Sequence, residues 1–208
     1  MFKLKFYNKA VVCFMSVMAL LVVGCGSDCE NCVAAFEASW FDARDGRTYK
    51  VVTIGSQTWM AENLNYEMPN SACFKNDPSK CEQYGRLYSW EAAMQACAEG
   101  WHLPSLEEWK ILIDAVGGDE MAGSVLKAKT GWLNNGNGSD IYGFSVLPAG
   151  YGFGKFEGEG DDAYFWSSYV NVERDRVGSM GFDDDHDNVY WYHYDEKTDG
   201  YSVRCLKN

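Results

Sequence analysis

This sequence is poor in basic residues and in histidine, and it has no apolar run long enough to cross a membrane. Its 208 residues include 18 Lys and Arg against 30 Asp and Glu, which gives a net charge of −12. A protein of this charge repels nucleic acid and anionic lipid head groups, so neither is an expected partner. Three histidines are too few to favour a zinc site, which usually takes three or four His, Cys or carboxylate ligands. The longest apolar run, residues 11–23, is shorter than the roughly 20 residues of a membrane-spanning helix.

The first 25 residues have the order of a secretory signal. Three lysines precede the apolar run, and the residues VVGC at 22–25 resemble the lipobox of bacterial lipoproteins. We therefore expect a signal peptide at 1–24, lipidation of Cys25 and a tether at 25–41; a plain secretory signal is the alternative. By resemblance to sorted bacterial lipoproteins, Gly26 in place of Asp favours the outer membrane or cell surface. Cleavage would leave 15 basic and 30 acidic residues, a net charge of −15 that favours neutral ligands, cations or basic partners.

The cysteines indicate an oxidising compartment. Cys13 lies in the expected signal and Cys25 takes the lipid, so six cysteines remain, an even number typical of disulfides in an exported domain. Six cysteines allow 15 pairings, and sequence alone does not choose among them. The simplest set is Cys29–Cys32, Cys73–Cys81 and Cys97–Cys205. The CENC stretch also has the spacing of a redox or zinc motif, but no second CxxC accompanies it.

The remaining length of about 165 residues corresponds to one domain. Residues 47–54 and 57–64 read as two short strands, and 69–85 as a loop closed by cysteines. Ser89 can cap a helix that ends near Gly100, and Ser105 with Glu108 forms a capping box for a second helix that ends at Gly117-Gly118. Five short β-type runs follow, separated by Gly and Asp clusters. This order predicts an α+β domain, two helices packed on a small twisted antiparallel sheet with long irregular loops.

Several ordered stretches resemble a known family. DARDGRTYKVVTIGSQTWMAENLNY, CFKNDPSKCEQYGRLYSWEAAM, GWHLPSLEEW, LKAKTGWLNNGNGSDIYGFSVLPAGY, YFWSS and YSVRC resemble, in this order, the Fibrobacter succinogenes major paralogous domain. The resemblance covers residues 42–207, so we place the domain at 42–208. It implies an exported protein with a C-type lectin-like fold, which formylglycine-generating enzymes also use. It further implies a disulfide from the first helix to the last strand, a bond that Cys97 and Cys205 could form.

The segment GFDDDHDNVYWYHYD, residues 181–195, allows three interpretations. Asp183, Asp185 and Asp187 could bind calcium, although the glycine and glutamate of an EF-hand loop are missing. Two histidines in the segment could contribute to a zinc site. The favoured interpretation is a β-hairpin with a solvated acidic tip. Alternation would then place Val189, Trp191 and His193 on one face and three tyrosines on the other.

For the function, the sequence favours a surface-tethered binding module. The candidate ligand contacts are aromatic and amide side chains of the glycine-rich half: Trp132, Asn135, Tyr151, Trp191 and Tyr192. Because the domain is poor in cations, the expected ligand is a neutral polysaccharide or a surface protein. The sugar-binding calcium motifs of C-type lectins are absent, so calcium-dependent sugar binding is not expected. No nucleophile-elbow motif or facing carboxylate pair points to catalysis; an oxidase like the formylglycine-generating enzymes and a structural envelope protein are the alternatives.

Overall fold

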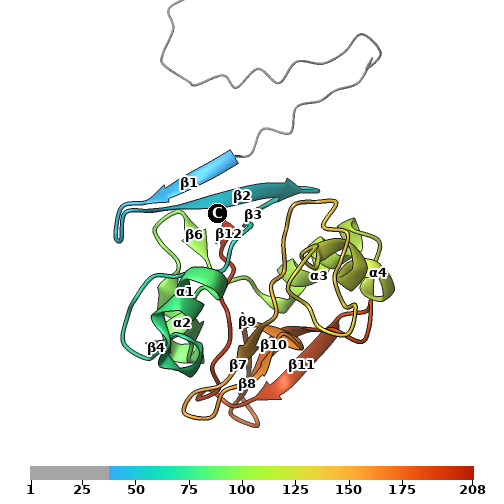
Figure 1. Cartoon of the computed structure of the whole chain (residues 1–208). Helices are drawn as coiled ribbons and strands as arrows, with labels where there is room; N and C mark the ends of the chain where they lie inside the picture. Colours follow the sequence, from blue (N-terminus) through green and yellow to red (C-terminus); the bar gives the residue numbers. More distant parts are fainter. Residues whose placement is uncertain (1–37) are drawn as a thin grey trace, which may run out of the picture. The chain divides into compact units, whose positions relative to one another are not determined.

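A computed structural model describes residues 38–208, which belong to one compact unit. The expected signal peptide, Cys25, Cys29 and Cys32 lie outside the described residues. Within this described part, the β-structure consists of two five-stranded sheets and a two-stranded one (Figure 1). The first sheet has the order β1-β2-β3-β12-β6 and is antiparallel throughout. Its strands are β1 (Ala38–Asp42), β2 (Arg47–Ile54), β3 (Gln57–Met60), β12 (Leu206–Lys207) and β6 (Trp101–His102).

The second sheet has the order β11-β10-β9-β7-β8 and contains one parallel pair, β7 with β9. Its strands are β7 (Ala149–Tyr151), β8 (Glu157–Glu159), β9 (Asp162–Asn171), β10 (Arg176–Asp183) and β11 (Tyr190–Asp195). The short strands β4 (Ser71–Ala72) and β5 (Leu87–Tyr88) pair separately. The α+β class is therefore confirmed, but two large sheets replace the single small one that the sequence predicted.

Residues 38–208 contain four α-helices instead of the predicted two. They are α1 (Pro78–Tyr84), α2 (Trp90–Ala96), α3 (Leu106–Ala115) and α4 (Asp119–Leu126), and a 3-10 turn, η1 (Phe74–Asn76), precedes α1. The Ser105–Glu108 capping box of α3 is confirmed. Helix α1 lies inside the region predicted as a loop, where Asp77 caps it and Pro78 occupies its first turn. Helix α4 begins directly after the Gly117-Gly118 pair, which separates two helices instead of ending the helical region.

Two boundaries differ from the predictions. Strand β1 begins at Ala38 and pairs with β2 along its whole length, so residues 38–41 are part of the sheet and not of the tether. Helix α2 ends at Ala96, four residues before Gly100, and Cys97 is its C-cap. Both disulfides within the described residues, Cys73–Cys81 and Cys97–Cys205, are confirmed. The second joins the end of α2 to the residue just before β12, although α2 is the second α-helix and not the first.

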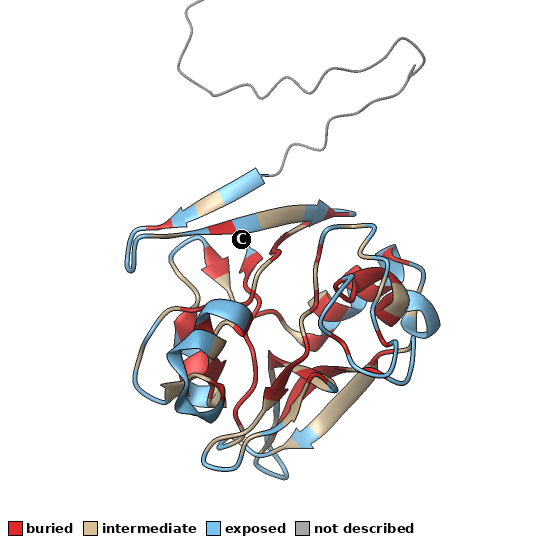
Figure 2. Ribbon diagram, in the orientation of Figure 1, coloured by how far each residue is buried: buried red, intermediate tan, exposed pale blue. Residues whose placement is uncertain are grey.

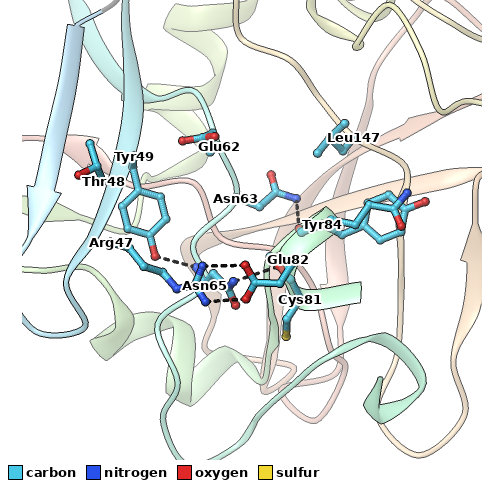
Figure 3. A pocket seen from close by; sticks show the side chains of 12 residues that line it. Arg47, Thr48, Tyr49, Glu62, Asn63, Asn65, Cys81, Glu82, Tyr84 and Leu147 are labelled. Atoms are coloured by element: carbon cyan, nitrogen blue, oxygen red, sulfur yellow. Dashed lines mark hydrogen bonds and ion pairs between the residues drawn. The ribbon is translucent and has the colours of Figure 1, made fainter. Parts of the chain in front are cut away.

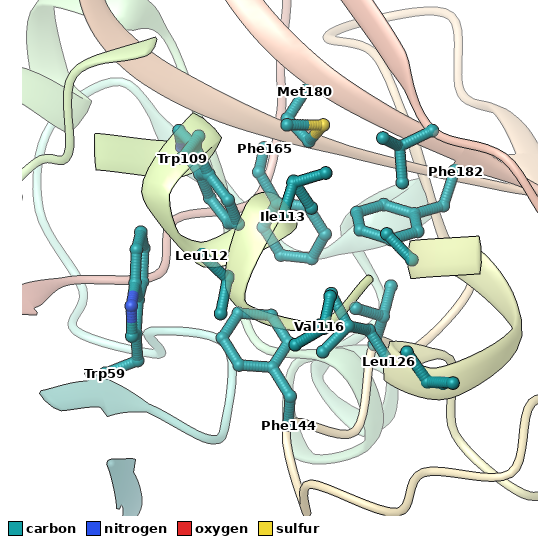
Figure 4. Close-up of a cluster of buried hydrophobic side chains, with 14 of the residues drawn as sticks. Trp59, Trp109, Leu112, Ile113, Val116, Leu126, Phe144, Phe165, Met180 and Phe182 are labelled. Carbon is teal, nitrogen blue, oxygen red and sulfur yellow. The ribbon is translucent and has the colours of Figure 1, made fainter. Parts of the chain in front are cut away.

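The larger core contains six aromatic residues. Trp59 and Trp109 are fully buried with ring centroids 4.6 Å apart, and Phe144 and Phe165 pack against Trp109. Figure 4 shows the apolar side of α3 facing side chains from the second sheet. Buried positions follow β9 and β10, whereas β1 and the outer sides of the helices are exposed (Figure 2). No helix between residues 38 and 208 is long and apolar enough to cross a membrane.

Candidate functional site

The acidic segment is a hairpin, as the favoured interpretation predicted. Strands β10 and β11 pair antiparallel with Met180 opposite Trp191, and the acidic residues form the connection. Asp183 Oδ1 accepts a hydrogen bond from the His186 backbone N–H at 2.7 Å. Asp184 is buried and accepts one from Asn134 Nδ2 at 2.7 Å. These contacts are those of a folded turn.

A lysine lies beneath this tip. The Lys127 side chain is 1% exposed, and its Nζ donates hydrogen bonds to the backbone oxygens of Asp183, at 2.9 Å, and His186, at 2.8 Å. Burial lowers the pKa of Lys127, while the carboxylates of Asp183, Asp184 and Asp187 act in the opposite direction. A buried charge is stable only where hydrogen bonds and opposite charges compensate its lost hydration. The ammonium group is therefore the internal cation of the acidic tip.

This arrangement leaves no preformed metal cluster. Between residues 38 and 208, no three His, Cys, Asp or Glu side chains are placed to hold a metal ion. Asp183 is engaged with His186, and Asp185 and Asp187 are exposed. His193 packs its ring edge-on against Tyr169, with the centroids 5.3 Å apart, and does not share a site with His186. The calcium and zinc interpretations thus have no geometric support in this hairpin.

The glycines and asparagines of residues 134–138 serve the same hairpin. A Cβ atom at Gly136 would overlap the backbone of Asp184, and one at Gly138 would overlap Lys127. Asn135 adopts a φ of 64°, a left-handed conformation that asparagine tolerates better than most residues. The loop can pack onto Lys127 and Asp184 because it lacks side chains at these two positions.

The predicted ligand contacts do not come together. Trp132 is 5% exposed and donates its indole N–H to the Val146 oxygen at 3.0 Å, so it is a core residue. Asn135 is exposed on its own loop. Tyr151 and Tyr192 belong to a cluster of tyrosine rings with Tyr164 at its centre, at centroid distances of 5.2 and 5.4 Å from it. Burial and its tyrosine neighbours raise the pKa of Tyr164, so this central ring stays protonated and uncharged.

Trp191 lies apart from that cluster, on the opposite face of β11, as the alternation predicted. Together with Tyr169 of β9 and His193 of β11 it lines a groove of about 330 Å³, which we call the Trp191 groove. The α-helices supply the rest of the lining: Leu106, Glu107 and Lys110 from α3 and Asp119 from α4. The position of α3 beside the second sheet brings these segments together (Figure 1).

The indole of Trp191 is held in place by a helix terminus. Its Nε1 donates a hydrogen bond to the side-chain Oδ1 of Asp119 at 3.1 Å. The backbone N–H of the buried Val189 donates one to the backbone oxygen of Asp119, also at 3.1 Å. Since the indole N–H already has an acceptor, the ring face is the part of Trp191 left for a ligand. The groove therefore offers aromatic surface on one side and the carboxylates of Glu107 and Asp119 on the other. Of its lining, sequence reasoning selected only Trp191 as a ligand contact, because contacts between β9, β11 and α3 are not visible in local patterns.

A second pocket, of about 250 Å³, lies between β2 and α1 (Figure 3). Its polar lining is engaged in internal contacts. Asn63 Nδ2 donates to the Tyr84 oxygen at 2.8 Å and Asn65 Nδ2 to the Cys81 oxygen at 3.0 Å, so both satisfy carbonyls at the end of α1. Arg47 pairs with Glu82 at 2.6 Å. These side chains hold α1 in place, and we assign this pocket a structural role.

The family comparison agrees with the resemblance seen in the motifs. The profile of the Fibrobacter succinogenes major domain matches residues 52–207, which include α1–α4, the Trp191 groove and both disulfides. No curated protein and no solved structure gives a significant match. Because the matched region is well over half of the sequence, this chain belongs to the Fibrobacter succinogenes major domain family.

Proposed function

We propose that this protein is an exported lipoprotein, anchored through Cys25, that binds polysaccharide in the Trp191 groove. The two disulfides support export, because such bonds persist in oxidising compartments. The VVGC sequence at 22–25 supports the anchor at the outer membrane or cell surface. A C-type lectin-like fold is part of this proposal, and the bond from Cys97 to Cys205 is in keeping with it.

The Trp191 groove is the observation that carries the proposal. Its volume lies at the lower end of the range for small-molecule sites, about 300–1,000 Å³. The rings of Tyr169, Trp191 and His193 provide apolar faces on which the C–H side of a sugar ring can stack. The carboxylates of Glu107 and Asp119 can accept hydrogen bonds from sugar hydroxyl groups.

We propose binding without catalysis. An oxidase like the formylglycine-generating enzymes needs a reactive thiolate, whereas each cysteine between residues 38 and 208 forms a disulfide. The groove contains one histidine and two carboxylates, and its histidine packs against Tyr169. A binding module needs no more than this arrangement of rings and hydrogen-bond acceptors.

The test uses the full-length protein, purified in detergent, on a glycan array and in pull-downs with insoluble polysaccharides. We expect retention by at least one polysaccharide, and loss of retention in Trp191→Ala. Tyr194→Ala is the matched control, because Tyr194 is on the same strand and 58% exposed but does not line the groove. Equal melting temperatures of the two variants would show that Trp191→Ala remains folded. If the wild-type protein binds no glycan and no cell-wall fraction, the proposal is wrong and a structural envelope role replaces it.

A further inference from the structure

Helices α3 and α4, which form one wall of the Trp191 groove, are strongly acidic. Lys110 is their single basic residue. The Lys110 ammonium is paired with Asp114 at 2.9 Å, one turn further along α3. Their five acidic residues are Glu107, Glu108, Asp114, Asp119 and Glu120.

Two of these five carboxylates line the groove. Glu108 is already used by the capping box and by His102, whose Nε2 lies 2.9 Å away. Glu107 is exposed and, within the described part of the chain, has no ion-pair partner. Asp119 is exposed as well. Its carboxylate accepts a hydrogen bond from the indole N–H of Trp191, which is an uncharged donor. The lining also contains Lys110, which is paired with Asp114 and interacts more weakly with Asp119. The aromatic surface of the groove is therefore bordered by two carboxylates, neither of which forms an ion pair within residues 38–208, and its lining carries an excess of negative charge.

Aromatic rings bordered by carboxylates favour a positively charged ligand over a negatively charged one. Aromatic faces attract cations through the ring quadrupole. Hydrogen bonds between a cation and a carboxylate are stronger than neutral ones. A cleft with an excess of one sign of charge also concentrates ligands of the other sign. An anionic polysaccharide, such as one rich in uronic acid, would meet repulsion in the same groove.

We propose that the ligand of the Trp191 groove is a sugar polymer that carries a protonated amine, with the amine near Glu107 and Asp119 and a sugar ring on Trp191. This inference rests on the proposed function and adds the chemical class of the ligand. A free amino group of a hexosamine unit has the required charge, whereas its N-acetylated form has the same ring without the charge. Both forms can stack on Trp191, and only the free amine can be attracted by the carboxylates, so a difference in affinity between them measures the contribution of charge.

The experiment measures binding of the full-length protein, in detergent, to three soluble hexamers, of glucosamine, of N-acetylglucosamine and of glucose. At low ionic strength and pH 6, we expect the glucosamine hexamer to bind at least about tenfold more tightly than its N-acetylated counterpart, a difference of about 1.4 kcal/mol. The preference should shrink as salt is added, because the carboxylates are at the surface.

Variants assign the preference to the groove. Glu107→Gln and Asp119→Asn should each reduce the preference for the glucosamine hexamer over the N-acetylglucosamine hexamer, because each removes a negative charge and keeps a hydrogen-bond acceptor. Glu120→Gln is the control, since Glu120 follows Asp119 on α4 but does not line the groove. Equal affinity for the three hexamers would refute the charge inference and leave polysaccharide binding in place. Binding of none of them, together with empty glycan arrays, would refute both.

Discussion

The buried arginine of the C-terminal segment offers a strong test of how this fold is held together. Arg204 is 0% exposed, and no carboxylate contacts its guanidinium. Its Nε donates to Asn63 Oδ1 at 2.7 Å and its Nη2 to the Ser145 oxygen at 2.8 Å. Its Nη1 donates to the backbone oxygens of Met60 and Phe144. Burial lowers the pKa of Arg204 to about 9, which leaves it protonated at neutral pH.

We predict that Arg204→Met destabilises the protein by about 3–5 kcal/mol. The substitution keeps much of the side-chain volume but removes the donors of four acceptors, three of them buried and the Ser145 oxygen partly buried. Each buried acceptor left unpaired costs about 1–3 kcal/mol, and relief from burying a charge offsets part of this cost, so the net loss should be about 3–5 kcal/mol. For a domain of this size the melting temperature should fall by roughly 10 °C.

Urea unfolding of the disulfide-intact protein, followed by tryptophan fluorescence, measures this loss. Arg204→Lys should reduce the free energy of unfolding at least as much as Arg204→Met, because one ammonium group cannot reach the acceptors of both segments, residues 60–63 and 144–145. Lys207→Met, an exposed change three residues later, is the control and should leave the unfolding free energy within about 0.5 kcal/mol of wild type. If the unfolding free energy of Arg204→Met is also within about 1 kcal/mol of wild type, the hydrogen bonds of the guanidinium do no more than balance the cost of its desolvation. The claim that they stabilise the fold would then be wrong.

Three further predictions follow from the geometry. Replacing Cys97 and Cys205 by serine opens a loop of 108 residues, and in the chain-entropy treatment it should lower the free energy of unfolding in urea by about 5 kcal/mol. Opening the eight-residue Cys73–Cys81 loop in the same way should lower it by about half as much. Burial and three nearby aspartates raise the pKa of Asp162 to about 6, so the folded state binds this proton more tightly than the unfolded chain, and stability should rise as the pH falls from 7 towards 4. Asp162→Asn should be more stable than wild type at pH 7 and equally stable at pH 4; thermal melts showing no such convergence would contradict the pKa. Lys127→Met should lower the melting temperature and make the amide hydrogens of residues 183–188 exchange faster, and unchanged exchange would mean that the ammonium does not hold the tip.

The acidic hairpin also shows how a metal-like sequence pattern can arise without a metal. Three alternating aspartates suggest oxygen ligands around a cation. In the folded chain the cation is the ammonium group of Lys127, more than fifty residues away in the sequence. We therefore expect calcium to leave the melting temperature unchanged, and a clear increase with calcium would show that the carboxylates can rearrange around the ion.

The sequence by itself determined those features that depend on neighbouring residues. The capping box at Ser105, the pairing of β10 with β11 and the alternation that separates Trp191 from Tyr192 were all predictable, because caps and strand faces follow from spacing along the chain. The family motifs also pointed to the bond between Cys97 and Cys205. Even α1 carried a local signal, the Asp77-Pro78 start, although it lay inside a region that the flanking cysteines made look like a loop.

Only the tertiary structure decided which of the many aromatic and charged side chains are available to a ligand. Trp132 lies in a glycine- and asparagine-rich stretch and Trp191 follows an aspartate-rich one, both of which look like exposed loops, yet Trp132 is buried and Trp191 lines a groove. The role of Lys127 likewise depends on which residues fold above it. Burial is the sum of contacts between segments far apart in the chain, and local composition does not specify those contacts. The Trp191 groove exists because β9, β11, α3 and the first residue of α4 meet, a juxtaposition that the packing of the core imposes.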